Sequence, residues 1–260
     1  MAKWTFSTDF FPIVVAHRGA SSDRPENTLE AFGAALEAGA QAVEMDVRLT
    51  ADGVPVVLHD PDVSRVTDGK GLVSELGLAE LKRLDASGGR GPSVEIPTLR
   101  EVLDLVSGRA GVDLEIKNIP GEPAFDPRQP GLIAALGALD SAGFIGPVLI
   151  SSFNPATIAR SRELEPDVPT GLLTPARVRP AEALALVREE GHPWVLPAAE
   201  ALKSAGAAFV EEAHEGGVRV GTWVVDEAAE MELLFGWGVD AVATNDPATA
   251  VAVRHGRLGA

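Results

Sequence analysis

Short apolar runs alternate along the chain with longer segments whose apolar residues recur at helical spacing. Runs such as Ile13 to Ala16 and Val148 to Ser152 have the length and the branched side chains of buried strands. Segments such as Leu99 to Val106 carry apolar residues three and four positions apart, as amphipathic helices do. Because consecutive parallel strands need a helical crossover, this alternation predicts an α/β fold with a parallel sheet.

The pattern predicts one strand more than the expected fold has places for. The predicted strands cover residues 13–16, 43–48, 54–58, 111–117, 148–152, 170–173, 194–197, 218–225 and 240–244. The predicted helices cover residues 29–38, 78–84, 99–106, 132–141, 155–164, 180–190, 201–215 and 227–237. The leading candidate is a closed (β/α)₈ barrel, the TIM barrel. Either the third strand is an extra hairpin strand, or the strand at Trp194 to Pro197 is irregular.

One domain accommodates the whole chain. Its 260 residues are enough for a substantial core and do not require a second unit. We expect a single TIM-barrel domain over residues 1–260, which begins with a short lead-in over residues 1–12. A small insertion over residues 61–97, polar and rich in glycine, follows the third strand at the mouth of the barrel.

The stretch from Ala42 to Asp60 is the most informative part of the chain. Glu44 and Asp46 alternate with apolar residues, so two carboxylates point from one face of a strand. Asp52-Gly53 then predicts a tight turn, and the following strand delivers His59. If the turn is a two-residue hairpin, His59 lies opposite Asp46; if the chain instead starts a parallel barrel strand, both lie at strand ends. Either arrangement brings His59 beside the acidic pair.

Two alternatives explain acidic residues on a buried strand. An unpaired buried carboxylate is costly, and a divalent cation removes that cost. The other remedy is an interior network of ion pairs in which Glu44 and Asp46 bind Arg18, Arg48 or Lys117. This segment alone does not decide between the metal site and the network.

Composition excludes several classes of partner and site. The chain has 22 Lys and Arg against 38 Asp and Glu, a net charge of −16, so we expect no nucleic-acid partner. It has no cysteine, which excludes thiolate metal ligands and disulfides. No apolar run reaches membrane-spanning length, so we expect no stable membrane insertion and a cytoplasmic location.

Polar residues collect at the ends of the predicted strands, where a TIM barrel carries its active site. Several of these strand ends carry Ser151, Ser152, Trp223, Asn245 and Asp246. The candidates with a chemical role are His17, Arg18, Glu44, Asp46, His59, Glu115 and Lys117. Three carboxylates without cysteine suit Mg²⁺, Ca²⁺ or Mn²⁺ better than Zn²⁺.

The remaining candidates complete a phosphate site. Arg18 and Lys117 beside a divalent cation would form an anion pocket. Two histidines, His17 and His59, suit a general acid and a general base, because imidazole gains and loses a proton near neutral pH. The other histidines, which do not lie at matching strand ends, are expected to be structural: His192, His214 and His255.

The chain resembles the glycerophosphodiester phosphodiesterases of the phospholipase C-like TIM-barrel superfamily. The resemblance lies in HRGASSDRPENTLEAF (17–32), GAQAVEMDVRLTADGVPVVLHD (39–60), IPTLREVL (96–103), LEIKN (114–118), SSF (151–153) and GVDAVATNDP (238–247). It implies metal-dependent hydrolysis of small-molecule glycerophosphodiesters to glycerol 3-phosphate and an alcohol. The implied roles are metal ligation for Glu44, Asp46 and Glu115, acid and base for His17 and His59, and phosphate binding for Arg18 and Lys117.

Two features bear on the rest of the substrate. Phe153 and Trp223 lie where they would line the glycerol or alcohol pocket, although aromatic residues at strand ends are often core. The family commonly has Trp-Thr-Val-Asn where this chain has Trp223-Val224-Val225-Asp226, a difference that concerns the alcohol pocket. The alternatives are a phospholipase D-like or cyclising phosphodiesterase on the same barrel and a noncatalytic barrel that binds a phosphorylated metabolite. The alcohol, the cation, the division of roles between the histidines and the oligomeric state stay open.

Overall fold

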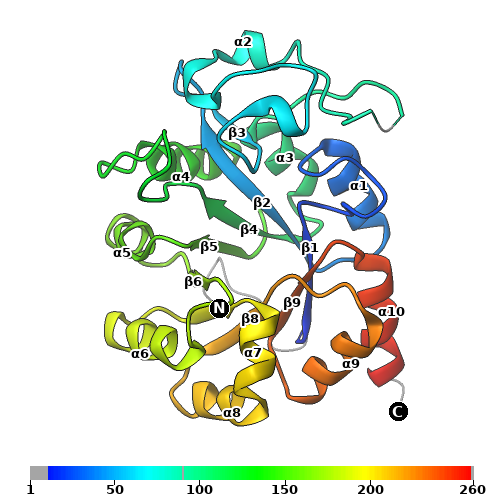
Figure 1. The fold of residues 1–260 in the computed structure, drawn as a ribbon, viewed down its shortest axis with the longest axis vertical. Helices are drawn as coiled ribbons and strands as arrows, with labels where there is room; N and C mark the ends of the chain where they lie inside the picture. The colour runs from blue at the N-terminus through cyan, green and yellow to red at the C-terminus, as the bar shows by residue number, and fades with distance from the viewer. Residues whose placement is uncertain (1–10, 90, 259–260) are drawn as a thin grey trace.

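Eight parallel strands close into a barrel in the computed structural model, which describes residues 11–89 and 91–258 (Figure 1). The barrel strands are β1 (Ile13–His17), β2 (Ala42–Leu49), β4 (Gly111–Ile116), β5 (Val148–Ser152), β6 (Thr170–Thr174), β7 (Trp194–Pro197), β8 (Arg219–Thr222) and β9 (Ala241–Thr244). The sheet closes because β1 pairs in parallel with both β2 and β9. The predicted TIM barrel is confirmed, and the strand at Trp194–Pro197 is a regular member of it.

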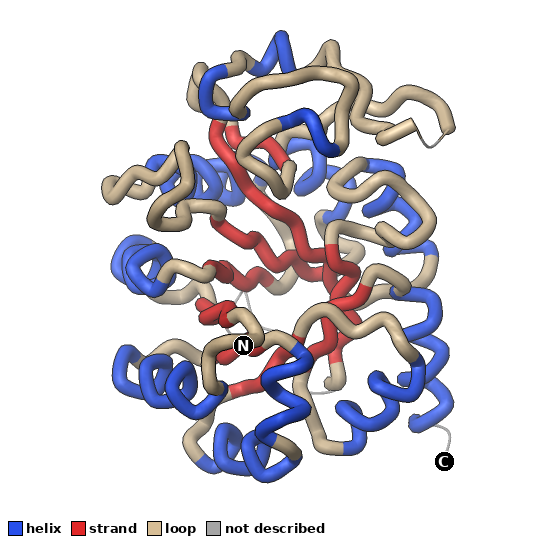
Figure 2. The backbone as a smooth tube through the Cα atoms, viewed as in Figure 1, coloured by secondary structure: helices blue, strands red, loops and turns tan. Residues whose placement is uncertain are grey.

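Helices surround the barrel (Figure 2). They are α1 (Leu29–Glu37), α3 (Leu99–Val106), α4 (Pro130–Ala142), α5 (Pro155–Leu164), α6 (Pro180–Glu190), α7 (Ala199–Ala205), α8 (Ala207–Glu215), α9 (Ala228–Gly236) and α10 (Pro247–Leu258). The core lies between these helices and the outward faces of the strands. In α3, for example, Leu99, Val102, Leu103 and Val106 recur at helical spacing and are fully buried. None of the described helices combines the length and apolar character needed to span a bilayer.

The surplus strand among the nine predicted is the third, at residues 54–58, and it is an extra hairpin strand. β3 (Pro55–Val57) pairs antiparallel with the end of β2, so the alternative of a parallel barrel strand at this point is wrong. The two-residue hairpin is also wrong, since Thr50 and Val54 pair across a loop of three residues that ends at Gly53, with φ of 79°. The register therefore places Leu58, rather than His59, opposite Asp46.

The insertion follows β3 and lies at the edge of the molecule, next to β3 and α3, at the top of Figure 1. It contains the short helical turns η2 (Val63–Arg65) and η3 (Val73–Glu75) and the helix α2 (Leu78–Leu81). Val63, Leu81 and Ile96 pack with β3 residues in a small apolar cluster of their own. The insertion is thereby fixed on the hairpin.

Two helical segments differ from the prediction. The single helix expected over residues 201–215 is two helices, α7 and α8, separated at Gly206, whose φ of 79° ends the first helix. The helix α10 was not predicted at all. The sequence does carry a helix-start signal, Asp246 followed by Pro247. In the structure Asp246 accepts from the Thr249 backbone N–H, and Pro247 occupies the first helical position.

Candidate active site

Three buried carboxylates meet inside the barrel. β2 and β4 are neighbours in register, with Asp46 beside Glu115, and Glu44 lies two residues before Asp46 on the same face. Each of the three offers an oxygen within 4.8 Å of the others. Glu44 Oε1 is buried and has no hydrogen-bond partner among the described residues. The donor set, with an oxygen left unpaired, fits a divalent cation that prefers oxygen ligands.

Burial and mutual repulsion determine the protonation of these groups. Burial, then the neighbouring Asp46 and Glu115 charges, raise the pKa of Glu44 well above its usual range. Burial raises the pKa of Glu115 to about 7, with a contribution from Asp46 and against the effect of Lys117. Burial also acts to raise the pKa of Asp46, but Lys117 and Arg18 hold it below its ordinary value. Asp46 is thus the carboxylate most firmly ionised.

Two cations flank the carboxylates. Arg18 Nε lies 3.1 Å from Asp46 Oδ2, and Lys117 Nζ lies 2.8 Å from Asp46 Oδ1 and contacts Glu115 Oε1. The network expected as the alternative to a metal site is therefore partly present. Arg48 does not join it; its Nε donates to the His59 carbonyl and its Nη1 to Glu122, so that part of the prediction is wrong.

The backbone after β1 is shaped to point Arg18 at the acidic cluster. Arg18 has a φ of 58°, and its N–H donates to Glu44 Oε2 at 3.0 Å. Gly19, with φ of 83°, lies so close to α1 that a Cβ would come within 2.5 Å of the Ala31 carbonyl carbon. A glycine is required here because the chain both turns left-handed and passes against a helix. Strain of this kind is typical of functional sites.

A buried amide at the start of α1 also serves the cluster. Thr28 caps this helix, since its side chain accepts from the Ala31 N–H. Asn27 instead donates from Nδ2 to Asp46 Oδ2 at 2.7 Å.

His17 is held by an amide. Its Nδ1 lies 2.8 Å from Asn245 Oδ1, and the Asn245 orientation is fixed because Nδ2 donates to Asp226 Oδ2 at 2.7 Å. The network therefore places the His17 proton on Nδ1 and leaves Nε2, which lies 4.0 Å from Glu44 Oε2, as the acceptor. Burial, then the Arg18 charge, lower the pKa of His17 to about 4.

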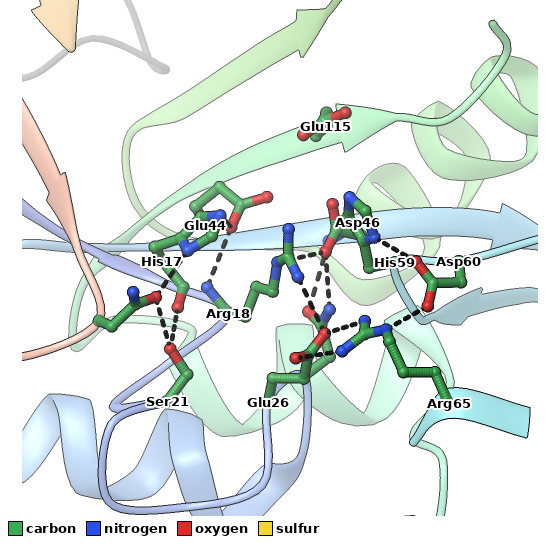
Figure 3. Close-up of polar contacts among 12 residues, drawn as sticks. His17, Arg18, Ser21, Glu26, Glu44, Asp46, His59, Asp60, Arg65 and Glu115 are labelled. Carbon is green, nitrogen blue, oxygen red and sulfur yellow. Dashed lines mark hydrogen bonds and ion pairs between the residues drawn. The ribbon is translucent and has the colours of Figure 1, made fainter. Parts of the chain in front are cut away.

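His59 is held by a carboxylate. Its Nδ1 lies 2.6 Å from Asp60 Oδ1, and Asp60 Oδ2 accepts from Arg65 of the insertion (Figure 3). Burial lowers the pKa of His59, and the nearby Asp46 charge opposes that effect. The two histidines thus differ in the group that binds Nδ1, which is an amide at His17 and a carboxylate at His59.

A cavity of about 120 Å³ inside the barrel is lined by candidate site residues and by apolar side chains. His17, His59 and Lys117 line it together with Phe153 and Trp223. The two aromatic rings meet edge to face, with centroids 5.3 Å apart. They are therefore placed at the cavity and not only in the core. On the other side of His17 and Arg18 lies a polar groove, to which the insertion contributes Arg65 and Ser87.

Asp226 lines the polar groove beside His17 and Arg18 rather than the aromatic cavity. It accepts from the Asn245 backbone N–H at 2.8 Å and from Thr244 Oγ1 at 3.0 Å. Its position beside Asn245 makes it a support for the His17 partner.

The other three histidines lie away from this centre. His192 is buried against Thr170 and Glu190, and His214 pairs with Asp240. His255 is exposed on α10. These contacts agree with the expectation that His192 and His214 are structural, whereas for His255 the expectation stays a prediction.

Comparison with known proteins identifies the barrel. The model of the glycerophosphoryl diester phosphodiesterase family matches residues 17–249. A glycerophosphodiester phosphodiesterase of Caldanaerobacter subterraneus is 36% identical over 246 residues, which cover 92% of this chain and 96% of the relative. A glycerophosphodiester phosphodiesterase of Bacillus subtilis is 30% identical and is covered to 84% of its length, with 90% of this chain matched.

A solved structure agrees with this result. It is a phosphodiesterase of Oleispira antarctica in complex with the product sn-glycerol-3-phosphate, with a TM-score of 0.85 and 29% identity, covering 95% of this chain and 98% of the other. The match extends over nearly the whole barrel, the two segments that carry the histidines included. The chain belongs to the glycerophosphoryl diester phosphodiesterase family.

Proposed function

We propose that this glycerophosphodiester phosphodiesterase releases glycerol 3-phosphate and an alcohol by a metal-dependent reaction in which His17 and His59 transfer protons. The observation that carries the proposal is that one end of the barrel brings together three carboxylates, two cations and two histidines, each of which is held through its Nδ1 atom. A purely binding protein needs no pair of proton-transfer groups.

Glu44, Asp46 and Glu115 would hold the divalent cation. The unpaired Glu44 Oε1 and the raised pKa values of Glu44 and Glu115 support this, because burial and the neighbouring carboxylates disfavour the ionised forms, which a bound cation would stabilise. When bound, Mg²⁺, Ca²⁺ or Mn²⁺ supplies Lewis-acid stabilisation of a phosphoryl oxygen.

Arg18 and Lys117 would bind the phosphate from the side of the carboxylates. Both lie against Asp46, so their charges are fixed before substrate binds. Preorganised cations of this kind favour the charge that develops in the transition state, because they need not reorient. The aromatic pair Phe153 and Trp223 would cover one ester arm of the substrate.

The partners of the two histidines suggest a division of roles. Asn245 is uncharged and fixes His17 with an unprotonated Nε2, which suits removal of a proton from the nucleophile, either water or the adjacent glycerol hydroxyl. Asp60 stabilises a positively charged ring at His59, which suits delivery of a proton to the oxygen of the departing alcohol. The P–O bond to that alcohol breaks as the bond to the nucleophile forms. His17 takes one proton from the nucleophile, and His59 gives one proton to the departing alcohol.

The test is release of glycerol 3-phosphate from glycerophosphocholine and glycerophosphoethanolamine with Mg²⁺, Ca²⁺, Mn²⁺ or excess EDTA. We expect release with a divalent cation, none in EDTA, and loss of release in Glu44→Gln, which keeps the shape of the side chain. The separation of cyclic from open phosphate products identifies the nucleophile. Metal-independent release, or none with any cation, contradicts the proposal.

A further inference from the structure

We propose that Arg65, a residue of the insertion, is a positioning residue that holds His59 and Arg18 in their working orientations at the same time. This inference rests on the proposed function, since it gives Arg65 a part in that reaction. It assigns the insertion a role in the catalytic centre as well as at its entrance.

The guanidinium of Arg65 joins two carboxylates. Nη1 donates to Glu26 Oε2 at 2.9 Å and Nη2 to Glu26 Oε1 at 2.7 Å, while Nε donates to Asp60 Oδ2 (Figure 3). Three N–H groups of one rigid fork are thereby used on two acceptors. The geometry is specific to arginine, because the ammonium of lysine is a single point and has no planar fork.

Each carboxylate in turn holds one group of the proposed mechanism. Asp60 uses its other oxygen, Oδ1, on His59 Nδ1 at 2.6 Å. Glu26 Oε1 also accepts from Arg18 Nη1 at 2.9 Å. Arg65 is thus connected to His59 through Asp60. It is connected to Arg18 through Glu26.

The fold of the insertion determines where Arg65 lies. Arg65 ends the turn η2, whose start is capped by the Asp62 side chain, an acceptor for the Ser64 N–H at 2.8 Å. Val63 of the same turn is fully buried in the apolar cluster of the insertion. Displacement of η2 would therefore withdraw the guanidinium from both carboxylates.

The arrangement contributes little to global stability. The Arg65 side chain is 48% exposed, and ion pairs in such positions contribute little to the free energy of unfolding. The effect of removing Arg65 should consequently be seen in kinetics more than in unfolding.

The experiment compares steady-state kinetics of Arg65→Met, Asp60→Asn and Glu26→Gln on glycerophosphocholine at saturating metal. Arg65→Met is expected to lower kcat/KM about ten- to a hundredfold, with a lower kcat and a higher KM, as removal of an outer partner of a functional group commonly does. Asp60→Asn should lower mainly kcat, and Glu26→Gln should raise mainly KM. Arg83→Met, a change at an exposed arginine of the insertion, should leave both constants unchanged.

Double variants decide between positioning and other roles. If Arg65 acts through Asp60 and Glu26, adding Arg65→Met to Asp60→Asn lowers kcat no further, and adding it to Glu26→Gln raises KM no further. Arg65→Lys should recover at most one of the two effects. Additive effects, which would indicate direct contact with substrate in the polar groove, overturn the inference, as do wild-type constants in Arg65→Met. An inactive wild type would instead refute the proposed function.

Discussion

The two histidines are similar residues in different surroundings. His17 Nδ1 faces a neutral amide, whereas His59 Nδ1 faces a carboxylate, although both residues line the same cavity. Because one carboxamide and one carboxylate stabilise the charged ring to different extents, identical side chains acquire different tendencies to hold a proton. In the proposed mechanism, the role of each histidine is thus determined by the residue that holds its Nδ1 atom.

Replacement of either histidine should stop proton transfer. We expect His17→Ala and His59→Ala each to lower kcat by about two to four orders of magnitude, the usual contribution of a general acid or base. Turnover in a glycerophosphocholine assay measures the effect, and His255→Ala, at an exposed histidine on α10, is the matched control. Near-normal turnover in both active-site variants would exclude the proposed pair.

Gly19 gives a prediction about stability. A Cβ at this position would lie 2.5 Å from the Ala31 carbonyl carbon, and the alanine would also have to adopt a φ of 83°. Gly53 has a similar φ of 79° but open space where the added methyl group would lie, so Gly53→Ala tests strain alone. We expect Gly53→Ala to cost about 1–2 kcal/mol of unfolding free energy in urea, and Gly19→Ala to cost clearly more. Equal costs would show that the approach to α1 is unimportant.

Sequence pattern predicted the candidate site residues that the structure brings together, but not the residues that hold them in place. The candidate ligands and histidines lie on strands or within two residues of a strand end, near the rim where the fold class itself predicts convergence. Asn245 and Arg65 contact partners that are 228 and 39 residues away in the chain, and no local pattern reports such pairing. Asn245 was visible only as one polar residue at a strand end, and Arg65 only as part of a polar insertion.

At the scale of elements, the errors have local physical causes. The β2–β3 register shifted by one residue because the turn has three loop residues, and Asp-Gly is compatible with more than one hairpin loop. The split between α7 and α8 occurs at a glycine inside an otherwise helical pattern, which sequence alone does not distinguish from a tolerated glycine. Strands and helices with strong periodicity, such as α3, were predicted at their observed bounds.

The α3 helix allows a clean test of an element boundary. Thr98 Oγ1 accepts from the Glu101 N–H at 3.2 Å, and Glu101 Oε2 accepts from the Thr98 N–H at 2.7 Å. We expect Thr98→Ala to lower the unfolding free energy by about 0.5–2 kcal/mol, since it leaves a helix-terminal donor unpaired. Thr98→Ser retains the acceptor and should keep most of the stability. A Ser variant as unstable as the Ala variant would place the effect in the lost methyl group.

At the scale of the whole molecule, the barrel places acidic groups in its interior at the expense of stability. Asp113, two residues before Glu115 on the same face of β4, has a pKa that burial raises to about 7, as does Glu115 itself. Asp113 accepts from Ser151 Oγ at 2.6 Å and is not part of the carboxylate cluster. Glu115 is therefore the candidate cation ligand of this pair, and Asp113 is the matched control for measurements of stability.

The unfolding free energy should report on both of these acids. An acid whose folded pKa lies above its unfolded value binds more protons when folded, so stability falls as pH rises from the unfolded pKa, 4.5 for Glu115, to the folded value of about 7. His17, with a lowered pKa, has the opposite effect below about pH 6.5, so the wild type must be compared with single variants. Without metal, the stability of the wild type relative to Glu115→Gln should decrease between pH 4.5 and 7.

Metal should reverse this loss of stability through Glu115 and not through Asp113. A cation that binds the ionised cluster of the folded protein stabilises it by mass action, and more strongly at about pH 8 than at about pH 5, because binding requires the carboxylates to be deprotonated. We expect the rise in Tm on adding Mg²⁺ or Ca²⁺ to be larger at the higher pH, to persist in Asp113→Asn and to disappear in Glu115→Gln. Persistence in Glu115→Gln would mean that the cation binds elsewhere, whereas loss in both variants would mean that the whole interior of β4, not the carboxylate cluster alone, holds it.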